Sequence, residues 1–347
     1  MTGAGARARR GRRGASEIRA ASPDELTGVR DTARAALALD AADVPLLVSR
    51  LAAPPEGRQW AALVTPGLEG VAFVSTSWRT EGVGCVDLLA VDPHAQGQGI
   101  GRALVTAAEE WLRERGVREA RLAGNPPCYA WPGIDVRYTA AACLAESLGY
   151  ERYRTAFNMT VDLTGYLPSG AEPVWDIAGG TGVTGGVEVG FGFAAGVPPT
   201  GEGPEVPAGA VSYEQELASL ASAGVAVRTA LPDEREAVVE FAREHWNDNW
   251  AWEVSQATGC HYAVRGGEIL GFASWGSRPC WFGPMGTAEA ARGLGVGRVL
   301  LRRCLQEQAA TGQRSTQIGW VDPWRFYART VGARVERVFW LYRRSLA

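Results

Sequence analysis

The feature that most constrains this chain is an internal repeat. The glycine-rich segment at residues 96–102 (QGQGIGR) recurs at residues 292–298 (RGLGVGR), each time between an apolar segment and an amphipathic one. A second pair of similar segments, LGY at 148–150 and VGA at 331–333, also precedes an apolar segment in each half. Two copies of one structural unit explain both pairs, whereas chance would have to supply each separately. The sequence therefore predicts two similar domains.

The length and composition of the chain agree with two domains. Its 347 residues exceed what one hydrophobic core usually serves, and 46% hydrophobic with 21% charged residues is an ordinary globular composition. Almost half of the residues from Gly179 to Gly209 are glycine or proline, a segment that buries too little apolar surface to become ordered. We expect a disordered basic tail at 1–15, domains at 16–165 and 212–347, and a Gly/Pro-rich linker at 166–211.

Charge and cysteine usage exclude several classes of function. A net charge of -3 gives no reason to expect nucleic-acid binding, although arginines cluster in the tail. The tail lacks the apolar core of a secretory signal, and we find no apolar stretch of membrane-spanning length. The six cysteines include no pair at CxxC spacing, so we predict no metal site. We expect a cytoplasmic protein without a membrane partner.

Each half shows the same order of expected elements. In the first half, alternating or apolar runs predict strands at 17–20, 60–64, 71–78, 83–91, 119–123 and 152–162, and helical spacing predicts helices at 22–39, 100–115 and 138–148. In the second half, strands are expected at 225–230, 262–264, 269–275, 281–286, 315–320 and 335–342, and helices at 212–223, 233–246, 296–310 and 323–331.

Each glycine run lies between an expected strand and an expected helix, where it can bind an anion. Glycine allows close approach of a ligand to the backbone, and the free N–H groups at the helix N-terminus attract negative charge. A diphosphate fits such a turn. A P-loop would require a lysine, which this chain lacks, and a Rossmann turn would follow the first strand of its unit rather than the fourth. The remaining alternative is a tight turn that binds nothing.

With its surroundings, the first run resembles the pyrophosphate signature of the GCN5-related N-acetyltransferase (GNAT) family, Q/R-x-x-G-x-G/A preceded by V-x-P. Val91 begins the V-x-P element, and the second copy has Glu289 where the proline would stand. The resemblance covers most of both halves. It implies an α/β (α+β) fold of two tandem GNAT domains, each a mixed, mostly antiparallel, twisted sheet flanked by helices. It also implies acetyl-coenzyme A (acetyl-CoA) as cofactor.

In this family the backbone of the glycine turn holds the coenzyme A pyrophosphate, and the preceding strand pairs with the pantetheine arm. The residues implied in the first half are Leu89, Ala90, Val91, Gln96, Gly97, Gln98, Gly99, Ile100, Gly101 and Arg102. Those in the second half are Met285, Gly286, Thr287, Arg292, Gly293, Leu294, Gly295, Val296, Gly297 and Arg298.

The family transfers the acetyl group directly from the thioester to an amine, which requires a base, a donor for the developing oxyanion and an acid for the thiolate. The acid is often a tyrosine in the helix after the fifth strand. Phe326 and Tyr327 resemble that element, so Tyr327 is a catalytic candidate, and packing in the core is its alternative. The first half has Ala145 at the matching position. It therefore uses another acid such as Tyr138, binds acetyl-CoA weakly, or is catalytically silent. We expect the second half to be the catalytic one and the first half to be partly or wholly supportive.

The base is less well specified. Asp87 lies on the fourth strand of the first half, where family members often carry a carboxylate, and a solvated position on the strand is its alternative. In the second half several carboxylates qualify and the sequence does not choose among them: Asp248, Glu253, Glu289 and Asp322.

Two segments rich in aromatic and acidic residues are candidates for acceptor binding. Residues 245–253 lie where GNAT folds place acceptor-binding helices, and residues 125–137 form a loop inserted after the fifth strand. Aromatic faces pack on sugar C–H groups and carboxylates hold an ammonium, so both segments suit an amino sugar. Filling of the core is the alternative. The candidate residues are Tyr129, Trp131, Asp135, Trp246, Asp248, Trp250 and Trp252.

A closer resemblance concerns residues 131–134, 283–287 and 318–333, which are similar to tandem GNAT proteins that include a bacterial glucosamine/glucosaminide N-acetyltransferase. It implies a small-molecule amine such as glucosamine or a cell-wall amino sugar as acceptor. One alternative is a mycothiol-synthase-like or secondary-metabolite acyltransferase, although the V-x-P and Asn-x-x-Ala elements of mycothiol synthase are missing from the second half. Another is a non-catalytic acetyl-CoA-binding or regulatory protein. We expect a monomer or a homodimer.

Overall fold

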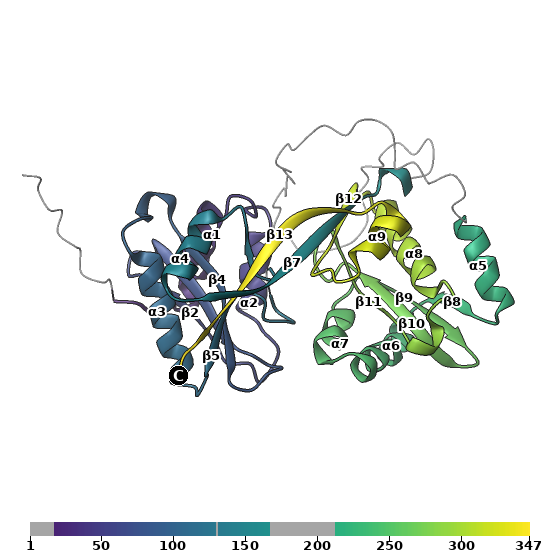
Figure 1. Ribbon diagram of the computed structural model, residues 1–347, viewed down its shortest axis with the longest axis horizontal. Coiled ribbons are helices and arrows are strands. Elements are labelled where there is room, and N and C mark those ends of the chain that lie inside the picture. Colours follow the sequence, from purple (N-terminus) through teal and green to yellow (C-terminus); the bar gives the residue numbers. More distant parts are fainter. Residues whose placement is uncertain (1–16, 130, 167–211) are drawn as a thin grey trace, which may run out of the picture. The chain divides into compact units, whose positions relative to one another are not determined.

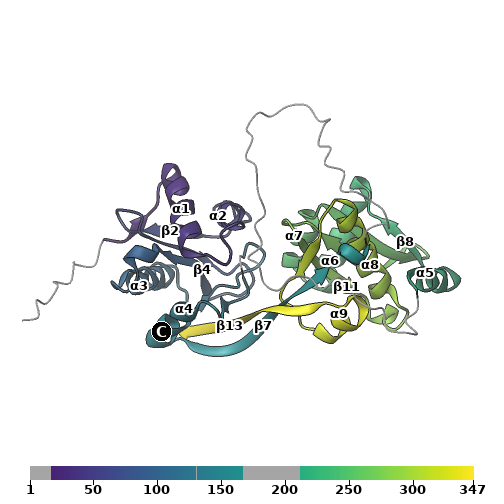
Figure 2. The same ribbon diagram turned by 90° about the horizontal axis from the view of Figure 1, so that it is seen from above.

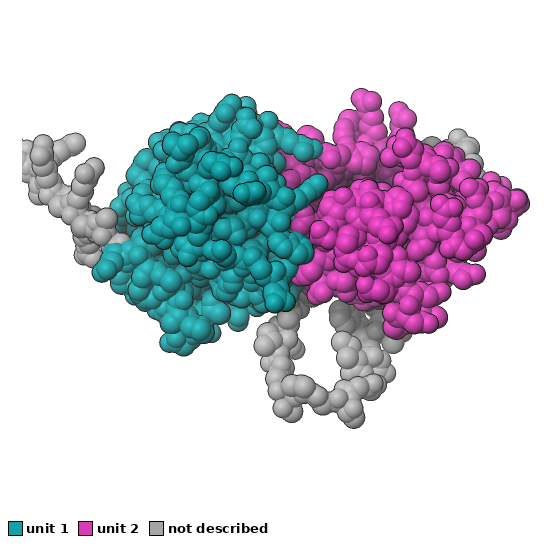
Figure 3. Space-filling view, turned by 90° about the horizontal axis from the view of Figure 1, so that it is seen from below, with its two compact units in different colours: residues 1–154, 341–347 teal, residues 155–340 magenta. Residues whose placement is uncertain are grey.

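The computed structural model describes residues 17–129, 131–166 and 212–347, which divide into two compact units (Figures 1 and 3). The first unit ends at Arg154 but also includes Leu341–Ala347, and the second unit comprises the described residues of Thr155–Trp340. The predicted tail at 1–15 and nearly all of the predicted linker at 166–211 lie outside the described residues.

The first unit contains the elements expected from the first half of the sequence. Its helices are α1 (Leu26–Ala36), α2 (Val44–Leu51), α3 (Ile100–Arg113) and α4 (Thr139–Ser147). Its strands are β1 (Arg19–Ala20), β2 (Trp60–Val64), β3 (Gly70–Thr76), β4 (Val83–Val91), β5 (Glu119–Leu122), β6 (Ile134–Asp135) and the start of β7 (Glu151–Asp162). Helix α2 and the short β6 were not predicted. The helix expected at 22–39 is shorter, because a 3-10 turn (Pro23–Glu25) precedes α1 and α1 ends at Ala36.

The sheet of the first unit has the strand order β1-β2-β3-β4-β5-β13, in which β4 and β5 are parallel and the other pairs are antiparallel. Helices α1 and α2 cover one face, and α3 covers the other (Figure 2). Helix α3 buries an apolar stripe that includes Leu104, Val105 and Leu112. Burying each such side chain contributes about 1.5–3 kcal/mol to folding, and the stripe fixes α3 against β3 and β4.

The second unit repeats this plan. Its helices are α5 (Tyr213–Ser222), α6 (Pro232–His245), α7 (Asp248–Ser255), α8 (Val296–Ala310) and α9 (Trp324–Val331). Its strands are β8 (Ala226–Thr229), β9 (Gly259–Arg265), β10 (Glu268–Trp275), β11 (Trp281–Thr287), β12 (Ser315–Ile318) and β13 (Arg334–Ser345). The strand order is β7-β12-β11-β10-β9-β8, with β11 and β12 parallel. The predicted α/β fold, with mixed, mostly antiparallel strands flanked by helices in each unit, is confirmed, and the strands of the described residues belong to one 13-stranded sheet rather than two.

The last strand of each half does not stay with its own half. Residues 159–162 of β7 pair with β12 in the second unit, and residues 342–345 of β13 pair with β5 in the first (teal and yellow ribbons in Figure 1). The compact units therefore differ from the contiguous domains expected at 16–165 and 212–347. Both last strands alternate buried and less buried residues, a pattern that fits the edge of either sheet region.

Among the described helices, none combines the length and the apolar character needed to cross a lipid bilayer.

Candidate active site

Two strands separate in the middle of each sheet. In the first unit, β4 pairs with β5 only from Val83 to Val86 and then continues to Val91 paired with β3 alone. In the second unit, β11 pairs with β12 only at Trp281 and Phe282 before it continues to Thr287. A parallel pair that diverges in this way leaves one edge of the longer strand without a backbone partner. That edge is where a ligand can pair with the strand.

The free edge carries outward-facing amides in both units. Asp92 donates its N–H to Glu69 at 2.7 Å, and hydrogen-bonded pairs alternate along an antiparallel ladder. The N–H groups of Leu89 and Val91 therefore point away from β3, toward the gap beside β5. In the second unit Ala288 donates to Leu270 at 2.9 Å. By the same alternation, the amides of Met285 and Thr287 face the corresponding gap.

The two glycine turns have the same backbone geometry. Gly97 and Gly99 have φ angles of 74° and 90°, and Gly293 and Gly295 have φ angles of 85° and 94°. Only glycine adopts this left-handed region readily, which explains the repeated glycines. Gly99 and Gly295 are the N-cap residues of α3 and α8. The N–H groups at the start of each helix are thus available to an anion, apart from that of Arg298, which donates to the Gly295 carbonyl at 3.1 Å.

The surroundings of the two turns differ. A side-chain carbon at Gly99 would meet no atom within 4 Å, whereas one at Gly295 would lie 3.2 Å from the guanidinium of Arg298. Arg298 donates through Nε to Glu216 of α5 at 2.5 Å, and Arg302 donates to the same carboxylate at 2.8 Å. The space beside Gly99 in the first unit is therefore open, whereas the space beside Gly295 in the second unit is flanked by Arg298, which Glu216 holds.

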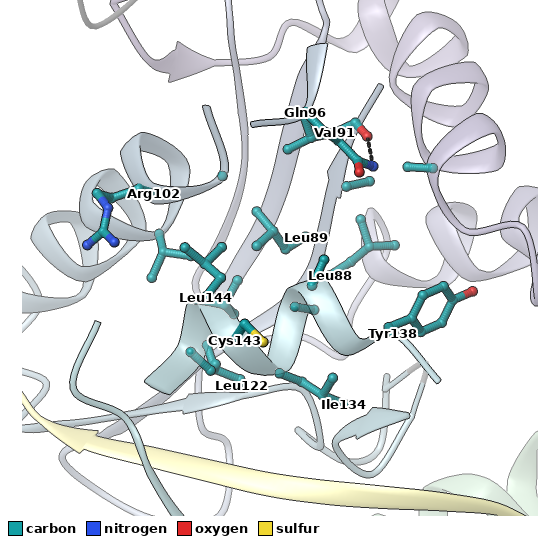
Figure 4. A pocket seen from close by; sticks show the side chains of 18 of the residues that line it. Leu88, Leu89, Val91, Gln96, Arg102, Leu122, Ile134, Tyr138, Cys143 and Leu144 are labelled. Carbon is teal, nitrogen blue, oxygen red and sulfur yellow. Dashed lines mark hydrogen bonds between the residues drawn. The ribbon is translucent and has the colours of Figure 1, made fainter. Parts of the chain in front are cut away.

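A cavity of about 900 Å³ lies in the first unit, lined by the end of α1, β4, the glycine turn with the start of α3, and α4 with the loop before it. Figure 4 shows Leu89, Leu144 and Tyr138 around it, and Gln96, whose amide donates to the Val91 carbonyl at 3.0 Å. All of the cofactor residues predicted in this half line it except Gln98. A volume of this size is in the range of small-molecule and cofactor sites.

Asp87 lines this cavity at a β-bulge. The register of β3 and β4 shifts between the Phe73–Leu88 and Val74–Val86 pairs, so Asp87 is the extra residue. A bulge redirects a side chain, and the Asp87 side chain is buried, with 4% relative exposure. The second unit has a bulge at the matching place, where Gly283 and Pro284 stand, without a carboxylate.

The environment of Asp87 suits a general base. Its Oδ2 accepts a hydrogen bond from the hydroxyl of Ser75 at 2.5 Å, and its Oδ1 has no hydrogen-bond partner among the described residues. Burial raises the pKa of Asp87 to about 7, and the Ser75 hydrogen bond and the charge of Arg58 oppose that rise. A carboxylate with a pKa near neutrality and one unpaired oxygen can accept a proton at physiological pH.

This raised pKa predicts a pH-dependent stability. Between the ordinary pKa of 3.8 and about 7, the folded state keeps a proton that the unfolded state releases, so the free energy of unfolding falls as pH rises through this window. We expect Asp87→Asn to raise that free energy by about 4 kcal/mol at about pH 8 and by almost nothing at about pH 4. Urea denaturation of the wild type and the variant at both pH values measures this difference. An equal gain in the free energy of unfolding at both pH values would exclude the charge of Asp87 as its cause.

The catalytic candidates of the second unit lie in different environments. Tyr327 of α9 is 7% exposed and packs in the core, with its ring centroid 6.3 Å from that of Phe282. Burial raises the pKa of its hydroxyl, which therefore stays protonated. Glu253 is half-buried on α7, and Asp322 is exposed just before α9. Glu289 is exposed and lies 3.8 Å from Arg292. Their catalytic roles stay predictions.

The acceptor candidates of the first unit partly converge on the cavity. Trp131 and Asp135 line it, whereas Tyr129 is half-buried and is not part of its wall. Trp131 donates through Nε1 to Asp40 at 2.9 Å, and the hydroxyl of Tyr138 donates to the other oxygen of Asp40 at 2.7 Å. Asp135 is paired with Arg137 at 2.8 Å. The buried carboxylate of Asp40 thus fixes the rings of Trp131 and Tyr138 in the cavity wall.

The aromatic candidates of the second unit make contacts typical of core residues. The rings of Trp246 and Trp250 stack with centroids 5.2 Å apart, and both meet Phe272 edge-on. Trp246 also lies over Gly286 of β11, where a side-chain carbon would come within 2.3 Å of its ring. These contacts favour the packing alternative for both tryptophans. Asp248 is exposed and pairs with Arg243 at 3.0 Å, and Trp252 is half-buried.

The sequence did not identify four polar residues around the site: Asp40, Arg58, Ser75 and Asn125. All four are at most 6% exposed. Asn125 stands in the inserted loop that was singled out for its aromatic residues, so its amide was visible in the sequence. The other three lie in ordinary apolar or loop segments and offer no pattern, because only the fold brings them to the site.

Comparison with known proteins agrees with this geometry. The acetyltransferase (GNAT) family matches residues 37–130 and 227–332, which together exceed half of the chain. The mycothiol acetyltransferase of Geodermatophilus obscurus is 34% identical over 97 residues, which is 28% of this chain and 25% of that protein. The match thus spans only a quarter of this relative's own length.

Three solved structures share the fold over nearly the whole chain. A GCN5-related glucosamine N-acetyltransferase region of a fungal multi-domain β-N-acetylglucosaminidase has a TM-score of 0.65 at 16% identity, covering 94% of this chain and 38% of that one. A tandem GNAT protein from the clavulanic acid biosynthesis pathway has a TM-score of 0.60 at 18% identity, with coverages of 95% and 99%. A GCN5-related N-acetyltransferase from Sphaerobacter thermophilus has a TM-score of 0.57 at 19% identity, with 95% of each chain covered. The chain therefore belongs to the GNAT family of acetyltransferases and carries two copies of the family's domain in tandem.

Proposed function

We propose that the first unit transfers an acetyl group from acetyl-CoA to the primary amine of a small molecule. One observation carries this proposal: a single cavity is lined by an open glycine turn, by a strand edge with unpaired amides and by the buried carboxylate of Asp87. The turn binds anions, the strand edge pairs with an amide-containing chain, and the carboxylate takes a proton. They correspond to holding the diphosphate of the donor, aligning its thioester and deprotonating the amine, which are three of the tasks in acetyl transfer to an amine.

The donor site fits the chemistry of acetyl-CoA. The first-turn amides of α3 and the turn at Gly97 and Gly99 would hold the pyrophosphate, because they offer several N–H groups without a competing side chain. The amides of Leu89 and Val91 would pair with the pantetheine arm and the acyl oxygen. When bound, acetyl-CoA supplies the acetyl group on a sulfur leaving group.

Asp87 would prepare the acceptor. Its Oδ1 takes one proton from the ammonium of the acceptor, which frees the nitrogen lone pair for attack. As the new C–N bond forms and the C–S bond breaks, the nitrogen loses a second proton, which neutralises the sulfur. The proton on Asp87 passes to solvent afterwards, so the carboxylate is regenerated for the next turnover.

An amino sugar is the acceptor class that the cavity wall favours. Trp131 and Tyr138 offer aromatic faces held by Asp40, and Asp135 adds a carboxylate. Such faces pack on sugar C–H groups. One structural relative carries the name of a glucosamine N-acetyltransferase region and one sequence relative that of a mycothiol acetyltransferase, which adds weight to a small-molecule amine.

For the second unit we propose a supporting role. Its glycine turn is flanked by Arg298, which is paired with Glu216, and its bulge lacks a carboxylate. Trp246 packs over Gly286 of β11. The second unit thus retains the shape of the donor turn, but it lacks the proton acceptor that the first unit has at the matching place.

The experiment that tests this function measures release of free thiol from acetyl-CoA with glucosamine, other amino sugars and aminoglycosides as acceptors. We expect turnover with at least one amino sugar, and we expect Tyr327→Phe to change kcat by less than about twofold. If Tyr327 were the acid of the active unit, its loss would lower kcat by about a hundredfold or more. Binding of acetyl-CoA without turnover on any amine would favour a non-catalytic protein instead.

A further inference from the structure

A chain of buried polar side chains lies behind Asp87. Ser75 of β3 donates to Asp87, and Nδ2 of Asn125 donates to the Ser75 hydroxyl at 2.7 Å. Asn125 also donates to the carbonyl of Thr76 at 3.2 Å. The guanidinium of Arg58 donates to the carbonyls of Asn125 at 3.1 Å and of Pro126. Three separate segments of the first unit are therefore linked to the Asp87 carboxylate through Ser75, the one residue of the three that contacts it.

The direction of each hydrogen bond among these side chains follows from the groups at the two ends of the series, the Thr76 carbonyl and the Asp87 carboxylate. The carbonyl of Thr76 can only accept, so the group that Asn125 turns toward it and toward Ser75 must be the amide NH2. The Ser75 hydroxyl accepts from that NH2, and its own single proton is left to donate. An ionised Asp87 can only accept, so the Ser75 proton points at Oδ2.

We propose that Ser75 and Asn125 are positioning residues that hold Oδ2 of Asp87 and so reserve Oδ1 for the proton of the acceptor. This inference deepens the proposed function, on which it rests for the role of Asp87. Ser75 and Asn125 line no part of the cavity, so they act through Asp87. Their contribution is to orient the carboxylate and to stabilise its ionised form.

The remaining titratable groups near Asp87 do not replace this contribution. Arg58 stabilises the ionised form through its charge, and Cys85 is a buried thiol on the same strand whose pKa is raised by its burial. Asp135, Arg137 and Tyr138 line the same cavity and have partners of their own. Ser75 alone donates a hydrogen bond to Asp87 among the described residues.

The test is a direct titration of Asp87 by NMR in protein labelled with carbon-13 at the aspartate carboxyl, with Asp87→Asn to assign the signal. We expect Ser75→Ala to raise the Asp87 pKa by about one unit, because the ionised form loses its hydrogen bond. Asn125→Ala should raise it by less, since the Ser75 hydroxyl remains but loses its orientation. In the Ser75→Ala background, Asn125→Ala should add nothing, because Asn125 acts through Ser75.

Thr76→Val is the matched control, because Thr76 neighbours Ser75 on β3 and its side chain contacts the Gln59 carbonyl rather than Asp87. An Asp87 pKa that stays within about 0.3 unit in both Ser75→Ala and Asn125→Ala would overturn the proposal. If Ser75→Ala does not fold, Asn125→Ala alone decides. A shifted Asp87 pKa in a chain that acetylates no amine would support the positioning role and refute the proposed function. An unshifted Asp87 pKa, together with acetylation that depends on Asp87, would refute the positioning role and support the proposed function.

Discussion

Asp87→Asn is expected to lower kcat/KM for acetyl transfer by about a hundredfold to ten-thousandfold at about pH 8, the range that a general base contributes. Asparagine keeps the size of the side chain and can still accept the Ser75 hydrogen bond, but it cannot take the ammonium proton. Binding of acetyl-CoA should change by less than about twofold, because the glycine turn and the free edge of β4 are untouched. Thiol release and calorimetry with acetyl-CoA measure the two quantities.

The pH dependence of the wild-type protein provides the second half of this test. Because burial places the pKa of Asp87 at about 7, kcat/KM should rise with pH through that value as the carboxylate ionises. In Asp87→Asn this rise of kcat/KM with pH should disappear. Asp31→Asn is the control, since Asp31 is an exposed carboxylate on α1. Equal losses of kcat/KM in Asp87→Asn and Asp31→Asn would show that another group is the base. The same conclusion would follow if kcat/KM of Asp87→Asn still rose with pH through about 7.

The second large effect is expected at the glycine turn of the first unit. Gly99→Glu should weaken acetyl-CoA binding by about tenfold to a hundredfold and remove transfer, because a carboxylate beside the helix N-terminus competes for the amides that would hold the pyrophosphate. The turn at Gly99 has open space for the new side chain, so no steric clash contributes, but its φ angle of 90° strains the backbone of any residue other than glycine. Calorimetry and the thiol assay measure it.

Gly295→Glu is the matched control in the second unit. Gly99 and Gly295 occupy the same position in the repeat and have φ angles of 90° and 94°, so both substitutions strain the backbone to a similar degree. We expect Gly295→Glu to leave kcat/KM within about threefold of the wild type. If instead Gly295→Glu abolished transfer and Gly99→Glu did not, the second unit would be the catalytic one.

Much of the fold was predictable because the local rules agree with it. The glycine turns begin α3 and α8 where the repeat placed them, since only glycine adopts the left-handed conformation that precedes each helix readily. The strands β4 and β11 begin at the predicted residues, because turn residues precede their apolar runs. Helices α2 and α7 were not predicted, and Pro45 of α2 lies in the first helical turn, where proline is tolerated.

The rest depends on contacts between segments far apart in the sequence. The strand exchange of β7 and β13 leaves no local mark, because either strand suits either sheet. Asp87 was predicted as a base from its strand, but the unpaired Oδ1 and the support from Ser75 arise from a bulge and an inserted loop. Trp246 looked like an acceptor residue because aromatic rings serve cores and ligands equally well, and its contact with Gly286 is visible only in the fold.

A crystal structure of the chain with acetyl-CoA would locate the donor site. We expect the coenzyme to lie in the first unit, with its pyrophosphate at Gly97 and Gly99 and its acyl oxygen about 2.9 Å from the Leu89 amide nitrogen. We also expect the thioester to lie on the side of the cavity that Asp87 lines. A coenzyme bound only at the turn of Gly293 and Gly295 in the second unit, or an excluded coenzyme in both units, would contradict this expectation.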